Sequence, residues 1–313
     1  MSEDNKVKVL VTGATGMQGG AVVQALLRAG YDVTAFVRNP SAAPAQALAQ
    51  QGVALATGNL EDLTSLEVAS AGHDVVFSVQ LAGVDPADPG AEHRQARNIV
   101  TAAKHAGIGQ IIHTSVSGTG WRSEHPGYEL SELYKAYWDE KEAAEDVVRQ
   151  SGIDRWTIFK PAFYMENFLP ADRTLQFPEL PEGKLVTATG TETVLALINS
   201  DDLGAAVAAA VADPEKFHEA EIEFAGDAFT YPRIADVMSK AAGREITYVN
   251  GTWEAPAELV GAAQPVGQTW DDRVGYPARP HHAAQYGLST TTFEQWAAQQ
   301  DWTLPDADQD GAK

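Results

Sequence analysis

Three glycines at strict three-residue spacing, Gly13, Gly16 and Gly19, separate a strand-like segment from a helix-like one. A turn from strand to helix leaves free backbone N–H groups and the positive end of the helix directed at one spot, which suits a pyrophosphate. In such a turn the first glycine permits the tight bend, the second lets the phosphates approach, and the third lets the helix lie close to the sheet. Thr15 and Gln18 offer side-chain hydrogen bonds nearby. The sequence therefore predicts a dinucleotide site, with a plain packing turn as the alternative.

The second predicted strand ends at Arg38 and Asn39, which bears on the choice of dinucleotide. An NAD-selective site usually carries Asp or Glu at this point to hold the ribose hydroxyls. A guanidinium can instead pair with a 2′-phosphate and stack on adenine. The sequence therefore predicts a preference for NADP(H), and an exposed, solvated arginine is the competing interpretation.

Tyr137 and Lys141 form the second candidate pair for chemistry, four residues apart on a predicted helix. This spacing places a phenol and an ammonium group on one face of the helix and within reach of each other. The same helix also carries Tyr134 and Lys135. Because aromatic residues at helical spacing usually pack, a packing role for Tyr137 is the alternative.

Short β-branched segments alternate with longer helix-patterned segments through the first half of the chain. This order predicts βαβ crossovers and an α/β fold, a doubly wound parallel sheet with helices on both faces. The expected strands span residues 6–12, 31–37, 53–57, 74–79, 110–116 and 156–160. The expected helices begin at residue 17, about 41, 63 and 91, and a long one ends before Gly152. A strand at 194–200 and a following helix, capped by Ser200 or Asp201, are expected to join the same sheet.

The chain has 313 residues, a formal net charge of −21 and no cysteine. The acidic balance disfavours nucleic acid and anionic lipid as partners, and the lack of cysteine excludes disulfides and thiolate chemistry. The start is unlike a signal peptide and the longest apolar stretches are too short to cross a bilayer, so we expect a cytoplasmic protein. Dispersed histidines, with one adjacent pair at His281 and His282, predict no metal site. A small molecule is the expected partner of a monomer or homodimer.

Seven segments, taken in chain order, resemble the NmrA-like branch of the short-chain dehydrogenase/reductase superfamily. They are TGATGMQGG (12–20), VRNP (37–40), GNLED (58–62), HTSVSG (113–118), KEAAEDVVRQSGIDRWTIFKPAFYMENF (141–168), INSDDLGAAVAAAVADP (198–214) and LSTTTFEQW (288–296). With this resemblance we expect a Rossmann domain formed by residues 1–160 and about 190–225. We expect a smaller, partly discontinuous α+β substrate lobe at about 161–189 and 226–304, and a frayed tail at 305–313.

The resemblance implies NAD(P)H binding by residues spread over the predicted Rossmann domain. Those expected around the pyrophosphate and the adenosine phosphate are Gly13, Thr15, Gly16, Met17, Gln18, Gly19, Arg38 and Asn39. Those expected along adenine, the riboses and nicotinamide are Asn59, Leu60, Ser78, Val79, Gln80, Lys141, Pro161, Phe163 and Tyr164. Asn59 departs from the Asp that similar proteins often have at this position.

The resemblance also implies roles for Tyr137 and Lys141, which have the Tyr-x-x-x-Lys spacing of the wider superfamily. In that superfamily the ammonium group lowers the pKa of the phenol and holds the nicotinamide ribose, while the phenol gives the substrate a proton. Ser115 lies where the superfamily keeps the hydroxyl that orients a carbonyl, and Ser117 is the substitute candidate.

We therefore expect an NADPH-dependent reductase that transfers hydride to an apolar, aromatic or conjugated carbonyl or quinone-type compound. Large apolar side chains after the fifth and sixth strands are expected to wall its substrate site. These side chains are Trp121, Tyr128, Tyr164, Met165 and Phe168. The alternative is a non-catalytic NADP(H)-binding redox sensor that acts through a protein partner, because the family contains both kinds of protein.

Overall fold

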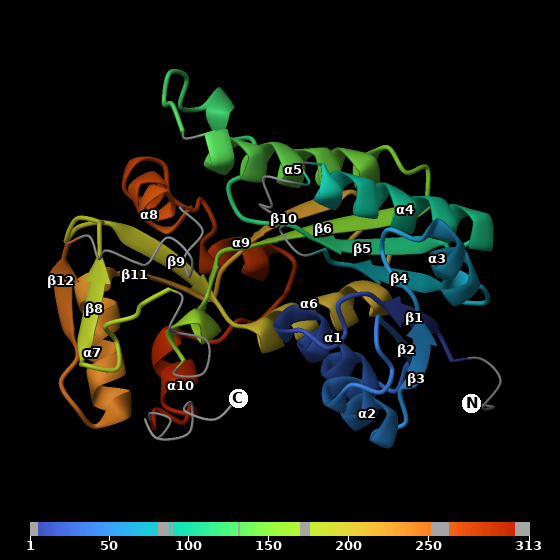
Figure 1. Cartoon of the computed structure of the whole chain (residues 1–313), viewed down its shortest axis with the longest axis horizontal. Coiled ribbons are helices and arrows are strands. Elements are labelled where there is room, and N and C mark those ends of the chain that lie inside the picture. The colour runs from blue at the N-terminus through green and yellow to red at the C-terminus, as the bar shows by residue number, and fades with distance from the viewer. Residues whose placement is uncertain are drawn as a thin grey trace.

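A seven-stranded parallel sheet with helices on both faces forms the larger part of the chain (Figure 1). The computed structural model describes residues 6–80, 88, 90–130, 132–169, 176–251 and 263–303, so the predicted tail lies outside the described residues. The strand order is β10-β6-β5-β4-β1-β2-β3, which reverses direction beside β1 and confirms the doubly wound prediction. Ligands of such sheets bind at the carboxyl ends of the strands, next to this reversal.

The strands of this sheet are short and mostly buried. Their bounds are β1 Lys8–Val11, β2 Asp32–Val37, β3 Ala54–Thr57, β4 Val75–Ser78, β5 Gln110–Thr114, β6 Arg155–Pro161 and β10 Ala220–Phe224. The central strands are continuous apolar runs, as expected where helices cover both faces of a parallel sheet. In β1, for example, Val9, Leu10 and Val11 are fully buried.

Two groups of helices cover the two faces of the sheet (Figure 1). One group comprises α3 Leu63–Ser70, α4 Ala91–Ala106 and α5 Glu132–Arg149. The other comprises α1 Met17–Arg28, α2 Ala43–Gln50 and α6 Ser200–Ala212. The helix starts predicted at residues 17, 63 and 91 are confirmed. No helix in the described part of the chain is long and apolar enough to span a bilayer.

The seventh strand of the sheet differs from the prediction. The segment expected at 194–200 forms β9 Val194–Ile198, which pairs with β7 Phe163–Tyr164 and β11 Asp227–Thr230 in a separate three-stranded sheet. The edge position beside β6 is taken by β10, whose alternating glutamates gave it a polar sequence. The cap prediction for α6 is also wrong, because Asn199 Oδ1 accepts a hydrogen bond from the Asp202 N–H at 2.8 Å.

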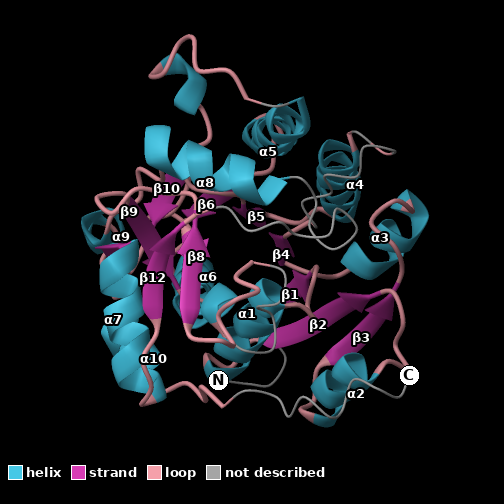
Figure 2. Cartoon of the chain, turned by 60° about the vertical axis from the view of Figure 1, so that its left-hand side comes forward, coloured by secondary structure: helices cyan, strands magenta, loops and turns pink. Residues whose placement is uncertain are grey.

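The smaller lobe has its own core beside the three-stranded sheet. Its other elements are β8 Lys184–Thr187, β12 Thr247–Asn250, α7 Tyr231–Ala242, α8 Ala263–Arg273 and α10 Phe293–Ala297. The short helix α9 Pro280–Gln285 packs instead on β10 of the larger sheet, where Ala283 is part of the core. Two short 3₁₀ turns, η2 Trp121–Ser123 and η3 Met165–Phe168, complete the chain's helical elements in the described residues. The parallel pair β8 and β12 lies beside α7 (Figure 2). The predicted domain bounds stay a prediction.

Candidate active site

The glycine turn between β1 and α1 is closely packed and opens toward solvent at its middle. Gly13 has a φ of +60°, and a Cβ there would lie 2.6 Å from Val79 Cγ1. A Cβ on Gly19 would clash with the Gly13 carbonyl oxygen, so the helix lies too close to the turn for a side chain. Gly16 is the N-cap of α1, no side chain caps it, and the first turn holds no acidic residue. The N–H groups at this helix start therefore have the free, positive setting that an anion needs.

The ends of β2 and β3 place two further predicted contacts at the same edge of the sheet. Arg38 is exposed and its guanidinium makes no ion pair or hydrogen bond with another described residue. Asn39 Oδ1 accepts from the Ser41 N–H at 3.0 Å and so holds the turn after β2. Asn59 is exposed after β3. Because parallel strands end at one edge, the free guanidinium and the glycine turn face a common region.

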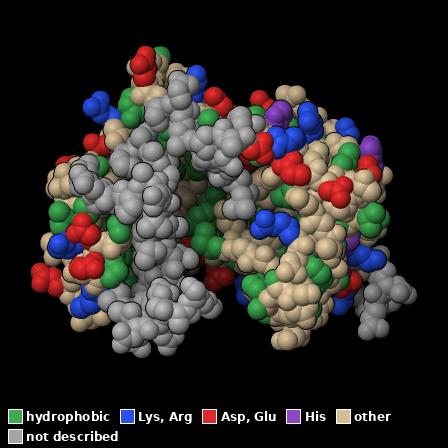
Figure 3. Space-filling model, in the orientation of Figure 1, with side chains coloured by type: hydrophobic (Ala, Val, Ile, Leu, Met, Phe, Trp, Pro, Cys, Tyr) green, Lys and Arg blue, Asp and Glu red, His purple; other side chains and the backbone are tan. Residues whose placement is uncertain are grey.

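A cavity of about 400 Å³ lies between the carboxyl ends of the central strands and the smaller lobe. The surface is visibly hollowed between these two parts of the molecule (Figure 3). Its size is within the range of pockets that bind small molecules. The predicted site residues that it brings together are Gln18, Gln80, Ser115, Tyr137, Lys141, Pro161, Phe163 and Tyr164.

Three buried polar atoms of the residues that line this cavity lack a hydrogen-bond partner among the described residues. They are the Ser115 hydroxyl oxygen, the Gln80 side-chain oxygen and the Tyr164 hydroxyl oxygen, in residues only 6%, 5% and 8% exposed. The Gln80 amide nitrogen donates to Ser78 Oγ at 2.8 Å, which holds the side chain in place. Buried polar atoms in native structures are normally paired, so these atoms are positions at which the polar groups of a ligand can bind.

Lys141 forms a buried ion pair that the sequence did not reveal. Its Nζ lies 2.7 Å from Glu92 Oε1, and the two side chains are 8% and 1% exposed. Burial alone lowers the pKa of Lys141, but the charges of Glu92 and Tyr137 outweigh it, and the pKa is raised. Glu92 stands in the first turn of α4, where an acidic residue is usually explained by the helix dipole. Its pairing with Lys141 becomes apparent only in the structure, where α4 packs against α5.

Tyr137 lines the cavity beside Lys141, but its phenol is not activated as the resemblance implied. The Lys141 Nζ lies 5.8 Å from the centre of the Tyr137 ring. Burial raises the pKa of the phenol, and the opposing effect of the ammonium group does not reverse this. The pKa of this phenol is therefore raised rather than lowered, because burial outweighs the effect of the ammonium group and the charge of Glu92 adds to it. The ring also packs, stacked on Tyr134 with centroids 5.8 Å apart.

Four of the five predicted substrate contacts lie away from the cavity lining. Trp121 is 5% exposed and packs edge-on against Tyr128 and two other tryptophans. Met165 and Phe168 are fully buried in the core of the smaller lobe. These four side chains are therefore packing residues here, and of the five only Tyr164 lines the cavity.

Residues that were not predicted as site residues supply the rest of the cavity wall. They are Val116, Tyr134, Ala162, Asn167, Gln176, Phe177, Tyr231, Gln268, Asp271 and Tyr276. Ser117, the substitute for Ser115, is fully buried and accepts a hydrogen bond from the Ala278 N–H at 3.3 Å. It is not among the residues that line the cavity. Ser115 is therefore the serine that the fold directs to the site.

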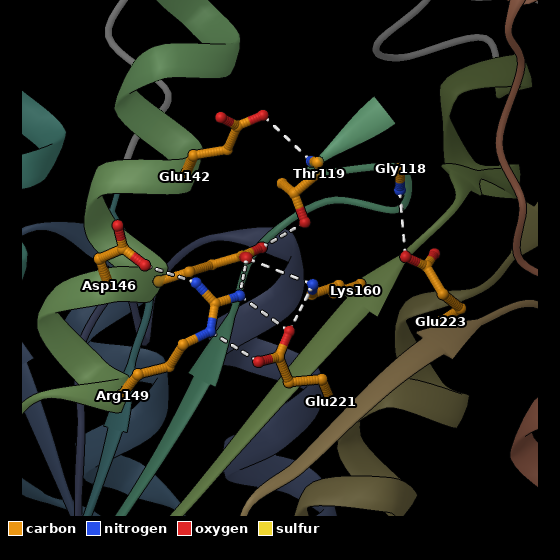
Figure 4. Close-up of polar contacts among 10 residues, drawn as sticks. Gly118, Thr119, Glu142, Asp146, Arg149, Lys160, Glu221 and Glu223 are labelled. Atoms are coloured by element: carbon orange, nitrogen blue, oxygen red, sulfur yellow. Dashed lines mark hydrogen bonds and ion pairs between the residues drawn. The ribbon is translucent and has the colours of Figure 1, made fainter. Parts of the chain in front are cut away.

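An ion-pair network anchors α5, and with it Tyr137 and Lys141, to the sheet (Figure 4). Lys160 on β6 lies 2.6 Å from Glu221 on β10 and 3.3 Å from Glu145 on α5. Arg149 contacts both of these carboxylates, each at 2.6 Å. Thr119 donates to Glu145 at 2.8 Å, which ties the loop after β5 to the same network. Several paired charges thus fix the helix relative to the strands whose ends form the cavity.

No cluster of three or more metal-ligating side chains occurs within the described ranges. The rings of His281 and His282 lie against each other, 4.2 Å apart, at the start of α9. Three acidic or histidine ligands are the usual minimum for a catalytic zinc site. The cavity presents hydroxyl, phenol, amide, ammonium and carboxyl groups.

Comparison with known proteins relates the whole fold to one family. The sequence profile of the NmrA-like family matches residues 5–268. Quinone oxidoreductase 2 of Escherichia coli (strain K12) is 31% identical over 246 residues, which cover 77% of each chain. The NAD(P)H azoreductase of Xenophilus azovorans is 30% identical over 261 residues, which cover 82% of each chain. The crystal structure of an E. coli NADPH-dependent quinone oxidoreductase with NADPH has a TM-score of 0.69 and 26% identity, covering 93% of this chain and 98% of that one.

Proposed function

The chain belongs to the NmrA-like family, and from this membership we propose that it is an NADPH-dependent reductase of quinone-type compounds. The observation that carries the proposal is that the Ser115 hydroxyl and the Gln80 side-chain oxygen, in one cavity with Lys141, have no hydrogen-bond partner in the described part of the chain. This cavity opens at the sheet edge that also holds the glycine turn and the free Arg38 guanidinium. A dinucleotide laid along this edge can reach all of these groups.

The residues present fit the cofactor at both of its ends. The N–H groups at the start of α1 suit its pyrophosphate, and Arg38 suits a 2′-phosphate. At the other end, Lys141 and Gln80 suit the ribose and amide groups of nicotinamide. A reduced nicotinamide supplies a hydride, and the protein supplies binding and orientation. The NADPH named for the E. coli quinone oxidoreductase structure and the NAD(P)H named for the azoreductase support the same cofactor for this chain.

The cavity's own side chains favour a flat, conjugated substrate. Phe163, Tyr164 and Phe177 offer apolar ring surface that binds such a molecule and keeps water out. The Ser115 hydroxyl has its proton free to donate to a substrate oxygen, where negative charge develops during reduction. Tyr137 keeps its proton at neutral pH because burial raises its pKa, so it can act as a second donor.

The experiment compares Ser115→Ala with Ser117→Ala in NADPH oxidation by 1,4-naphthoquinone. Loss of one donor to a developing oxyanion costs about 100-fold in kcat, so S115A should lose that much while NADPH affinity stays within about threefold. S117A is the matched control, because its hydroxyl is buried on Ala278 outside the cavity. Equal rates for the two variants would contradict the proposed role of Ser115.

The same assay separates the reductase from the sensor. A wild-type chain that binds NADPH but oxidises it with no member of a panel of quinones, azo dyes and enones would overturn the enzyme proposal. That result would favour a redox sensor acting through a protein partner. The expected result is turnover of quinones at least tenfold faster than that of simple ketones, because conjugated rings fit the aromatic walls.

A further inference from the structure

Asp271 places a carboxyl group in the cavity, on a wall that no part of the proposed mechanism uses. It stands near the end of α8 and lines the same cavity as Ser115 and Lys141. Its Oδ2 accepts a long hydrogen bond of 3.5 Å from the Tyr231 hydroxyl, and its Oδ1 has no partner among the described residues. This second oxygen is therefore available to a ligand.

The surroundings of Asp271 hold the carboxyl in its neutral form. The titratable groups that face it are the phenols of Tyr128, Tyr134, Tyr231 and Tyr276, together with the neighbouring carboxyl of Asp272. No cationic group in the described part of the chain pairs with it. A buried carboxyl without a cation keeps its proton, and burial raises the pKa of Asp271 to about 8.

The next residue, Asp272, has the same side chain as Asp271 but lies in a different environment. Asp272 accepts hydrogen bonds from the Gly190 N–H at 3.0 Å and from the Thr193 hydroxyl, and these lower its pKa. Two adjacent aspartates thus have opposite protonation preferences because one faces the cavity and the other faces a loop.

We propose that Asp271 is the acid that protonates the far oxygen of a conjugated dicarbonyl substrate, which makes compounds with two conjugated carbonyl groups the preferred class. The inference rests on the proposed function. Bound NADPH would supply the hydride: a C–H bond of its nicotinamide would break, and the same electron pair would form the new bond to the substrate. The electron pair displaced through the conjugated system moves to the far carbonyl oxygen. There the Asp271 O–H bond breaks, a hydroxyl O–H bond forms, and the carboxylate regains its proton from solvent.

Asp271 suits this step better than Tyr137. Burial raises the pKa of the Tyr137 phenol above its ordinary value of about 10, whereas the carboxyl of Asp271 titrates near neutrality. Proton transfer is most effective when the pKa of the acid lies close to the working pH. Asp271 stands on α8, which packs against α5, the helix that carries Lys141. A substrate in this cavity therefore has the carboxyl of Asp271 as a donor in addition to the Ser115 hydroxyl.

The test compares Asp271→Asn with Asp272→Asn in turnover of 1,4-naphthoquinone with NADPH. Asn keeps the shape and a hydrogen-bond donor but cannot release a proton. We expect D271N to lose about 100-fold in kcat, the usual contribution of a general acid. Wild type should lose kcat/KM about tenfold per pH unit above pH 8, and D271N should lack this fall. D272N should behave as wild type.

A second readout does not depend on turnover. Infrared spectra of the chain without added nucleotide should show a neutral carboxyl band that disappears as the pH rises through about 8 and is missing in D271N. Wild-type activity in D271N, or an ionised Asp271 at pH 7, would overturn the inference. If D271N lost activity toward a cationic dye but not toward quinones, the inference would also be overturned, because Asp271 would then act as a counter-ion. If the wild-type chain reduces no quinone, the proposed function is wrong. If wild type and D271N reduce quinones equally well, the proposed function stands and only the role of Asp271 is wrong.

Discussion

Replacing Glu92 by Gln removes one half of the buried ion pair while keeping the size of the side chain. Exposed ion pairs contribute about 0–1 kcal/mol, but Glu92 and Lys141 are only 1% and 8% exposed at a separation of 2.7 Å. Removing one partner of such a buried pair leaves an uncompensated charge and costs about 3–5 kcal/mol. For a large domain about 2 °C of Tm corresponds to each kcal/mol, so E92Q should melt about 6–10 °C below wild type.

The pH dependence of this effect has a definite sign. The pKa of Lys141 is raised in the folded chain, so the stability from its pairing is present at neutral pH and is lost as the pH rises through that raised value. In E92Q, burial acts without the carboxylate and lowers the pKa of Lys141. Lys141 should therefore lose its proton at a lower pH in E92Q than in wild type. The NADPH affinity of E92Q should also begin to fall at a lower pH.

The assay is thermal unfolding of E92Q, Lys141→Met and the double variant, with NADPH titrations of each. The double variant should be more stable than E92Q, because it contains no unpaired buried charge. A Tm for E92Q within 1 °C of wild type, or a double variant as unstable as the sum of the two single variants, would refute the reasoning. Either result would mean that the Lys141 ammonium group reaches solvent when Glu92 no longer pairs with it.

Two further predictions concern the cofactor edge. Arg38→Ala should weaken NADPH binding at least tenfold and NADH binding less than threefold, because the guanidinium is exposed and unpaired; equal losses in calorimetry would mean that it does not contact the phosphate. Gly19→Ala should lower the Tm and abolish NADPH binding, since its Cβ would clash with the Gly13 carbonyl, whereas Gly20→Ala has a nearest contact of 3.6 Å and should be tolerated. Similar behaviour of the two alanine variants would show that the turn adapts.

Much of the larger sheet could be predicted because its signals are local. A β-branched run followed by spaced glycines and a helical pattern identifies the first βα unit from about twenty residues of sequence, and the structure confirms it. The error at the sheet edge arose because strand pairing is not local. β9 and β10 both have strand character, and only the packing of β6 shows that β10 is its neighbour.

The missed parts of the candidate site are also products of long-range packing. Glu92 lies 49 residues from Lys141, and Asp271 lies 40 residues from Tyr231. Neither pair has a local pattern that relates its members. Trp121 shows the opposite error, since a large aromatic residue in a loop after a strand suits either a ligand wall or a core. Here Trp121 packs with Trp138 and Trp270 and is therefore a core residue.

The central claim is that the carboxyl edge of the sheet holds NADPH with its nicotinamide end in the cavity. Calorimetric titration of the purified chain with NADPH tests it most directly. The account predicts one site per chain with a dissociation constant of about 1–100 μM, a range common for enzyme ligands, and weaker binding of NADH. An absence of heat with NADPH and NADP⁺ at millimolar concentration would contradict it.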